Sequence, residues 1–187
     1  MSPASSRLAV VYNPTKVGVD EVRRRATARA SRHGWTDPVF LETTEDDPGT
    51  GQAGEAAAQG AGLVIACGGD GTVRSVAQGL IGTTVPMGVV PLGTGNLLAR
   101  NLDIPLDDVD RALRVAMTGR SRAIDIGEVR YTDGEGDSHD DVFLVMLGAG
   151  MDADMIAGTD DDLKARVGWL AYVGAFASTL LRGHRIR

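Results

Sequence analysis

Two glycine-rich segments constrain this chain more than any other feature, because each follows directly on a short apolar run. The first segment, 68–72, reads Gly-Gly-Asp-Gly-Thr and comes after the apolar run 63–67. The second segment, 91–96, reads Pro-Leu-Gly-Thr-Gly-Asn and comes after the run 87–90. An apolar run of this length is typical of a buried strand, and glycines at its end favour a tight turn. We therefore expect two strand–turn–helix units.

The same alternation extends over most of the first 120 residues. We expect strands at 8–12, 39–41, 63–67 and 87–90, and helices at 20–33, 52–59, 73–80, 96–101 and 107–117. Within this pattern Asp20 is expected to cap the first helix. Strands and helices that alternate with short connections predict an α/β fold, with a mostly parallel sheet and helices on both faces. In such a sheet both glycine turns would open at the carboxyl edge, where open α/β folds bind ligands.

The pattern changes near residue 122. Two strand-like runs, 124–131 and 141–147, flank an acidic loop that contains glycine, which predicts an antiparallel hairpin. A further helix is expected at 164–181, with an aromatic face. The residues after the change, roughly 60 in number, are too few to close a second sheet and bury both of its faces. We therefore expect an α/β domain followed by a partial β-rich domain, with bounds at 1–122 and 123–187.

Composition and charge exclude several classes of protein. The chain carries 25 acidic and 19 basic residues, a net charge of −6, which argues against a nucleic-acid partner. The single cysteine, Cys67, cannot form an internal disulfide, which is typical of an intracellular protein. The apolar run near the N-terminus is too short for a signal peptide, and the stretch 167–181 is shorter than the ~20 residues of a membrane span. We expect a cytoplasmic protein, and a peripheral position at a membrane stays open.

The first glycine turn carries the groups that a phosphate needs. Its glycines let backbone N–H groups approach an anion, and the following helix presents its N-terminal amides. Thr72 can cap that helix or donate a hydrogen bond to a phosphate oxygen. Asp70 would lie beside the anion, where its carboxylate can position Mg²⁺, accept the proton of an attacking hydroxyl, or simply act as a cap. The second turn repeats this chemistry one strand later, so the two turns together can hold one polyphosphate.

Several nucleotide-binding patterns are absent from the sequence. Neither lysine, Lys16 or Lys164, follows a glycine or precedes Ser or Thr, so there is no Walker A motif. No Gly-x-Gly-x-x-Gly fingerprint follows a strand, and protein-kinase signatures are missing. Charge neutralisation at the turns must therefore come from a metal ion, arginine and backbone N–H groups.

Four motifs in this order resemble the catalytic domain of the diacylglycerol kinase family. They are Asn13-Pro14, Thr44-Glu45, the run 68–73 and the run 91–100. That family includes bacterial lipid kinases and sphingosine kinases, and it is more distantly related to NAD kinases and phosphofructokinases. The resemblance is strong over residues 7–130 and continues more loosely through 125–127, 148–153 and 164–172.

The resemblance implies an activity and a site. It implies an ATP-dependent lipid kinase of phospholipid metabolism, which passes the γ-phosphoryl group of ATP to a lipid hydroxyl such as that of diacylglycerol, with Mg²⁺ bound. Asp70 is implied both as a catalytic residue and as the contact for the metal. The residues implied to bind the nucleotide are Asn13, Pro14, Thr44, Gly68, Gly69, Asp70, Gly71, Thr72, Val73, Arg74, Ser75, Gly93, Thr94, Gly95 and Asn96.

The chain departs from the family pattern at several positions. Arg74-Ser75 stands where relatives commonly carry Asn-Glu, and Leu97 stands where they commonly carry Asp. The late Asp-Gly-Glu motif implied to supply a catalytic base is missing after residue 150, and 133–135 holds the one copy in the chain. Two alternatives therefore stay open, an NAD kinase-like phosphotransferase and a truncated nucleotide-binding module without catalysis. The uncovered apolar edge of a partial second domain also predicts a homodimer.

Overall fold

The computed structural model describes residues 6–132 and 136–147. The described residues up to Leu144 belong to one compact unit, and 145–147 belong to a second one. The helix expected at 164–181 lies outside the described residues. The domain boundary expected after residue 122 stays a prediction. In the described part of the chain, no helix is both long and apolar enough to cross a membrane.

A four-stranded parallel sheet forms the centre of the first unit, in the order β2-β1-β3-β4. Its strands are β1 (Arg7–Tyr12), β2 (Val39–Glu42), β3 (Ala61–Gly68) and β4 (Met87–Pro91). Ala66 of β3 pairs with Val11 on one side and with Val89 on the other. Parallel neighbours require crossover connections, and a helix lies between each pair of consecutive strands. The predicted mostly parallel sheet is confirmed.

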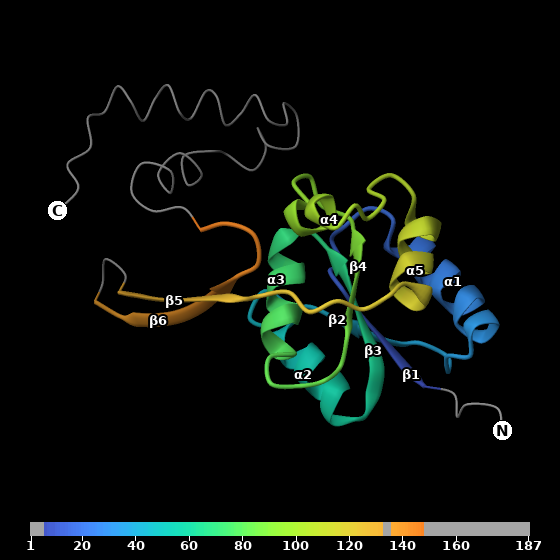
Figure 1. Ribbon diagram of the computed structural model, residues 1–187, viewed down its shortest axis with the longest axis horizontal. Helices are drawn as coiled ribbons and strands as arrows, with labels where there is room; N and C mark the ends of the chain where they lie inside the picture. The colour runs from blue at the N-terminus through green and yellow to red at the C-terminus, as the bar shows by residue number, and fades with distance from the viewer. Residues whose placement is uncertain (1–5, 133–135, 148–187) are drawn as a thin grey trace. The chain divides into compact units, whose positions relative to one another are not determined.

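Helices cover both faces of this sheet, as predicted (Figure 1). They are α1 (Val19–Ala30), the short 3₁₀ helix η1 (Ser31–His33), α2 (Thr50–Ala58), α3 (Asp70–Gly79), α4 (Leu97–Asn101) and α5 (Val109–Thr118). Side chains of α1 and α5 pack in one hydrophobic cluster, and side chains of α2, α3 and α4 pack in the other. The sheet is therefore the middle of three layers.

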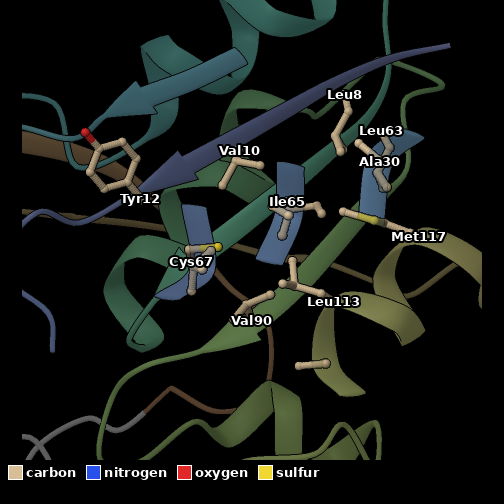
Figure 2. Packing of buried hydrophobic residues seen from close by; sticks show 13 residues of the cluster. Leu8, Val10, Tyr12, Ala30, Leu63, Ile65, Cys67, Val90, Leu113 and Met117 are labelled. Atoms are coloured by element: carbon tan, nitrogen blue, oxygen red, sulfur yellow. The ribbon is translucent and has the colours of Figure 1, made fainter. Parts of the chain in front are cut away.

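The two clusters divide the strand residues by their alternation. In β1, Leu8 and Val10 face the α1 and α5 side, whereas Val11 faces the α2 and α3 side. Figure 2 shows the first cluster, in which Val10 gathers with Ile65 of β3 and other fully buried side chains. Strands covered on both faces read as continuous apolar runs, which is why the sequence predicted them well.

Cys67 lies at the end of β3 in the first cluster and is completely buried, as expected of a small core residue. Burial raises the pKa of its thiol far above the ordinary value, since the charged form would lose its hydration. The thiol therefore stays protonated and serves in packing.

Three helices, α1, α2 and α3, begin earlier than the sequence predicted. α2 starts at Thr50, two residues before its expected start. α1 starts at Val19 behind Gly18, which has a φ of 96°, so Asp20 lies in the first turn and does not cap the helix. α3 starts at Asp70, with Gly69 as its N-cap. Thr72 therefore lies inside the first turn of α3 and cannot be its cap. Glycine is a poor helix former, so the sequence pattern assigned these residues to a turn, whereas the packing of α3 makes them helical.

The expected hairpin is confirmed with different bounds. β5 (Gly127–Thr132) and β6 (Ser138–Phe143) pair in antiparallel fashion, with Thr132 opposite Ser138. Part of the acidic segment expected in the loop therefore belongs to β6. Arg130 Nε donates a hydrogen bond to Asp140 Oδ1 across the strands at 2.6 Å, and this bond lowers the pKa of the Asp140 carboxyl. Cross-strand charge pairing explains how acidic residues fit into this ladder.

Candidate functional site

The carboxyl ends of the four parallel strands meet at one edge of the sheet. Tyr12 at the end of β1 pairs with Glu42 and Cys67, and Gly68 at the end of β3 pairs with Pro91. The loops that follow the four strands are therefore neighbours. Every position predicted for the nucleotide site lies at this edge or in α3, which starts from it.

The first glycine turn leads directly into the N-terminus of α3. Gly69 has an extended backbone with a φ of −87°, and no side chain caps the helix. The first amides of a helix have no partner within it, and they carry the positive end of its dipole. α3 has ten residues, so this dipole is well developed. The first turn therefore offers open N–H groups that favour an anion.

Close packing beneath this turn requires glycine at position 68. A Cβ on Gly68 would come within 2.6 Å of Oγ1 of Thr72, whose side chain is buried. Val73 and Ser75 are also buried, in the interior beneath α3. Thr72 forms the base of the turn, whereas Ser75 lies at the start of α2, with its Cβ 3.6 Å from a Cβ built on Gly49. The exposed positions that α3 contributes to the edge are Asp70 and Gly71.

The second glycine turn is closed by its own asparagine. Asn96 has a left-handed backbone with a φ of 50° and is 8% exposed. Its side-chain Nδ2 donates to the Gly93 carbonyl at 2.7 Å, and its Oδ1 accepts from the Gly93 amide at 3.1 Å. Both the oxygen and the nitrogen of the Asn96 side chain are therefore hydrogen-bonded inside the turn. Thr94 and Gly95 are exposed at its tip.

Asp70 joins the two turns. Its Oδ2 accepts a hydrogen bond from the backbone N–H of Asn96 at 2.9 Å, and its Oδ1 accepts one from the backbone N–H of Leu97 at 2.6 Å. These amides belong to the N-terminus of α4, so a carboxylate at the start of one helix caps the next. Hydrogen bonds to a charged acceptor are stronger than neutral ones. We call this pair of bonds the Asp70 brace.

Glycines allow the close approach that the Asp70 brace needs. A Cβ on Gly93 would come within 2.6 Å of the Cα of Gly69, which is backbone and cannot move aside. A Cβ on Gly95 would come within 2.7 Å of Oδ2 of Asp70. Part of the glycine content of the second turn is therefore explained by contact between the turns.

The loop after β1 adds the predicted residues Asn13 and Pro14. The Asn13 amide donates to the Cys67 carbonyl at 3.1 Å, which ties the loop to the end of β3. Its side-chain Oδ1 accepts from the amide and the hydroxyl of Thr15, at 2.9 and 2.8 Å. Pro14 is exposed beside it. Asn13 therefore shapes its own turn at the edge.

The loop after β2 adds Thr44, which is exposed. Its amide donates to the Asp47 carbonyl at 2.9 Å, and its Oγ1 accepts from the Asp47 amide at 3.0 Å. Thr44 thus closes a short turn at the same edge. The ends of β1 and β2 are tied further by the Tyr12 hydroxyl, which donates to Glu42 Oε2 at 2.9 Å. Burial is the largest cause that raises the pKa of Tyr12.

Two arginines lie near the turns. Arg74, predicted as a nucleotide contact, forms an ion pair with Asp141 of β6. Arg100 was not predicted, yet its Nε donates to the Gly95 carbonyl at 2.7 Å, so its guanidinium lies against the second turn. Arg100 follows Asn96 by four residues, and helical side chains point back toward the N-terminus. That spacing is the sequence signal that could have identified it.

The fit of a magnesium ion can be judged from the donor groups. Among residues 6–132 and 136–147, no three His, Cys, Asp or Glu side chains cluster as a metal site. Each oxygen of Asp70 accepts one backbone N–H, and each keeps a further lone pair. Magnesium bound with a nucleotide takes one or two carboxylates, phosphate oxygens and water. These residues therefore fit a Mg²⁺ ion carried by the nucleotide, and they do not form a separate cage.

An open parallel sheet with glycine turns and a helix N-terminus at its carboxyl edge defines a class of α/β proteins that bind phosphate-bearing ligands there. The family model of the diacylglycerol kinase catalytic domain matches residues 7–129, which is more than half of the chain. The chain belongs to the diacylglycerol kinase catalytic domain family. The family predicted from the four motifs is thus confirmed.

Curated relatives carry names of the same kind. A protein of Pseudomonas savastanoi pv. phaseolicola named "Probable lipid kinase YegS-like" is 34% identical over 171 residues, which cover 90% of this chain and 52% of the relative. The protein named "Diacylglycerol kinase" of Bacillus subtilis is 32% identical over 172 residues, with 89% and 53% covered. The chain spans about half the length of these relatives.

A solved structure supports the fold. The crystal structure of a diacylglycerol kinase from Bacillus anthracis str. Sterne superposes with a TM-score of 0.51 at 21% identity, over 67% of this chain and 46% of that chain. At this identity the likeness concerns the fold. The predicted α/β architecture of the diacylglycerol kinase type is confirmed.

Proposed function

We propose that this chain forms the nucleotide-binding part of an ATP-dependent lipid kinase, with diacylglycerol as the representative acceptor. Membership of the family supports a kinase, and the names of the relatives support a lipid acceptor. The observation that carries the proposal is the open N-terminus of α3 lying against a second turn that the Asp70 brace holds in place. An anionic polyphosphate is the ligand that suits this pair of turns.

Each group at the edge has a role in this proposal. The α3 amides bind phosphate oxygens, Thr94 donates a hydrogen bond from the tip of the second turn, and Arg100 adds positive charge behind that turn. Magnesium, bound with ATP, supplies charge neutralisation for the phosphates. Asp70 is the residue that would contact this ion, with the lone pairs that the Asp70 brace leaves unused.

Phosphoryl transfer asks for positioning more than for covalent chemistry by the protein. The acceptor oxygen forms a bond to the γ-phosphorus while the bond to the β,γ-bridging oxygen breaks, ADP leaves with that electron pair, and the proton of the acceptor hydroxyl passes to solvent water. Asp70 would hold a metal ion bound to the phosphates, and its bonds to the Asn96 and Leu97 backbone amides fix the distance between the two turns. We propose it as the catalytic residue of the described part.

The proposed lipid acceptor implies where in the cell the protein would work. A diacylglycerol molecule stays in a bilayer, so the chain would work as a cytoplasmic protein that meets the membrane surface. Phospholipid metabolism is the process that this chemistry serves. The homodimer expected from the sequence stays a prediction, which light scattering can test.

Nucleotide binding is the first test. Calorimetric titration of the 187-residue chain with ATP and Mg²⁺ should give saturable binding. Replacing Thr94 with Val should weaken it by about tenfold, since one hydrogen bond to a charged group is lost. Thr118→Val is the matched control, because Thr118 is exposed at the end of α5 and bonds only to the Arg114 carbonyl there. Absence of saturable binding would exclude the proposal for this chain.

Transfer is the second test, and it separates the alternatives. The chain is incubated with γ-labelled ATP and either diacylglycerol in mixed micelles or NAD. Label in the lipid, lost in Asp70→Asn, is the expected outcome. Label in NAD would favour the NAD kinase-like alternative. ATP binding with no transfer to either acceptor would favour a nucleotide-binding module without catalysis.

A further inference from the structure

A groove runs along β4, the edge strand of the sheet, and it shares no residue with the predicted nucleotide site. Its volume is about 660 Å³, within the range of pockets that bind small molecules. It extends from residues 83–86, which precede β4, past 87–89 to Leu98 of α4 and to Leu102, the residue after α4. The groove therefore follows the first part of the edge strand.

The walls of the groove are mainly apolar and come from both sides of β4. α3 and the residues after it contribute Ala77, Leu80 and Ile81, and α5 contributes Val115 and Ala116. Residues 119–124 and Ile126, in the segment 119–126 between α5 and β5, complete the lining, and the exposed Asp125 lies between Ile124 and Ile126. Ile81, Val115 and Ile124 are 46%, 42% and 38% exposed, which is unusual for large apolar side chains grouped around one hollow.

The charged groups of the groove have one sign. Of the described residues that line it, the charged ones are Arg120 and Arg122, and no carboxylate is among them. Hydroxyl groups of Thr84 and Ser121 add hydrogen-bonding capacity, whereas the Thr83 hydroxyl already donates to the Leu80 carbonyl. This contrasts with the whole chain, whose net charge is −6. An apolar hollow whose two charged lining residues are arginines is complementary to an apolar molecule with an anionic end.

We propose that this groove binds an anionic amphiphile, with one acyl chain between β4 and the segment 119–126 and the acidic head group at Arg120 and Arg122. The segment 119–126 already flanks β4, so a strand from a second copy would have to displace it. A flexible acyl chain can enter a hollow that is walled on both sides. The anionic head then pairs with guanidinium groups, which suit phosphate geometry.

The proposal does not depend on the proposed kinase activity. The groove residues lie along β4, whereas the nucleotide is expected at the glycine turns. Titration with ATP on the same samples therefore separates the two ideas. Loss of ATP binding with retained lipid binding would count against the kinase alone, and the reverse result would count against the groove alone.

The test uses two single-chain lipids that differ in their heads. The 187-residue chain is titrated with oleoyl lysophosphatidate and with monooleoylglycerol, both below the concentrations at which they form micelles. We expect saturable one-to-one binding of the lysophosphatidate. The double variant Val115→Asp with Ile124→Asp should weaken it by about tenfold or more, because carboxylates in the groove resist burial. Arg120→Gln with Arg122→Gln should remove the preference for the anionic lipid.

Matched controls keep the result specific. Val39 is 50% exposed on β2, the opposite edge strand, so Val39→Asp adds a charge of the same kind away from the groove. Arg111→Gln removes an exposed arginine of α5 that does not line it. Both controls should bind lysophosphatidate as the original chain does. Thermal unfolding checks that each variant folds, and Ile124→Ser is a milder substitution if the double variant does not.

Three outcomes would overturn the proposal. Binding that survives all groove variants would place the lipid elsewhere. Equal affinity of the original chain for both lipids would remove the role of the arginines. A dimer that Val115→Asp dissociates, together with absent lipid binding, would assign the groove to a second copy of the chain.

Discussion

The two glycine turns of this protein share a composition and a position at the ends of neighbouring strands, yet they lead into different helices. The first leads into α3, a helix of ten residues without a capping side chain. The second leads into α4, a helix of five residues whose first amides are bound by Asp70. The helix amides at the first turn are therefore left for a ligand, whereas those at the second turn are hydrogen-bonded within the protein.

This difference shows that glycine in a turn can serve two separate purposes. Nothing lies within 4 Å of a Cβ built on Gly71, so its small size leaves space for a ligand. A Cβ on Gly93 would meet the backbone of Gly69, so there the small size permits contact between turns. We expect substitutions in the two turns to affect binding and stability in different proportions.

Gly93→Ala should have the largest effect. The added methyl group would press on the Cα of Gly69 and force the turns apart, at a cost of about 1–3 kcal/mol, as for other overpacked sites. Urea unfolding should show this loss, and calorimetry should show that ATP binding is lost with it. A stable Gly93→Ala variant would mean that the turns are not in tight contact.

Asp70→Ala should come next. It removes both bonds of the Asp70 brace, and the loss of a capping side chain costs about 0.5–2 kcal/mol. Urea unfolding measures this loss, and ATP affinity should fall because the second turn is no longer held. Asp107→Ala is the matched control, an exposed aspartate between α4 and α5 that takes no part in the Asp70 brace. Unchanged stability in Asp70→Ala would refute the structural role of the brace.

Gly71→Ala should separate the two purposes of glycine, space for a ligand and contact between turns, because it should affect binding without lowering stability. Alanine in a helical position is favoured over glycine by about 0.5–1 kcal/mol, so the free energy of unfolding should stay level or rise. The methyl group would occupy the space before the α3 amides, and ATP affinity should fall severalfold in calorimetry. A fall in stability as large as that of Gly93→Ala would erase the contrast between the turns.

Arg74→Ala should have the smallest effect. The side chains of Arg74 and Asp141 are 41% and 26% exposed, and ion pairs at such sites contribute about 0–1 kcal/mol. Thermal unfolding should therefore change little, and Asp141→Asn should match it. A loss of ATP affinity in Arg74→Ala alone would show that Arg74 leaves Asp141 to contact the nucleotide, as the sequence predicted.

The fold could be predicted well because burial leaves a simple signal. Strands covered on both faces, such as 8–12 and 63–67, appear as unbroken apolar runs, and the glycines after them mark the turns. Helix starts were predicted less well, since packing made Asp70 and Gly71 helical against their local preference. The hairpin was predicted, but the bounds of β5 and β6 were not, because β6 includes acidic residues that pair across the strands and that periodicity assigns to a loop.

The site was predicted as a set of loops and not as a set of contacts. The sequence predicted that Asn13, Thr44 and both turns lie at one edge, because the loops that follow parallel strands share the carboxyl edge of the sheet. The sequence did not show that Asp70 accepts hydrogen bonds from the backbone amides of Asn96 and Leu97. Such bonds depend on how two loops approach each other in space. The sequence likewise assigned Ser75 a place in the site, although this side chain is buried.

Because of the Asp70 brace, the two turns should be exchanged together when segments of this protein and its relatives are recombined. A chimera joined within 81–86 would take its first turn from one parent and its second from another, although the carboxylate, its two amide partners and the facing glycines have to match. A crossover before β3 or after α4 would carry the complete pair. The smallest span that carries both turns of the proposed phosphate-binding edge is therefore 61–101, and recombination that respects those limits should preserve it.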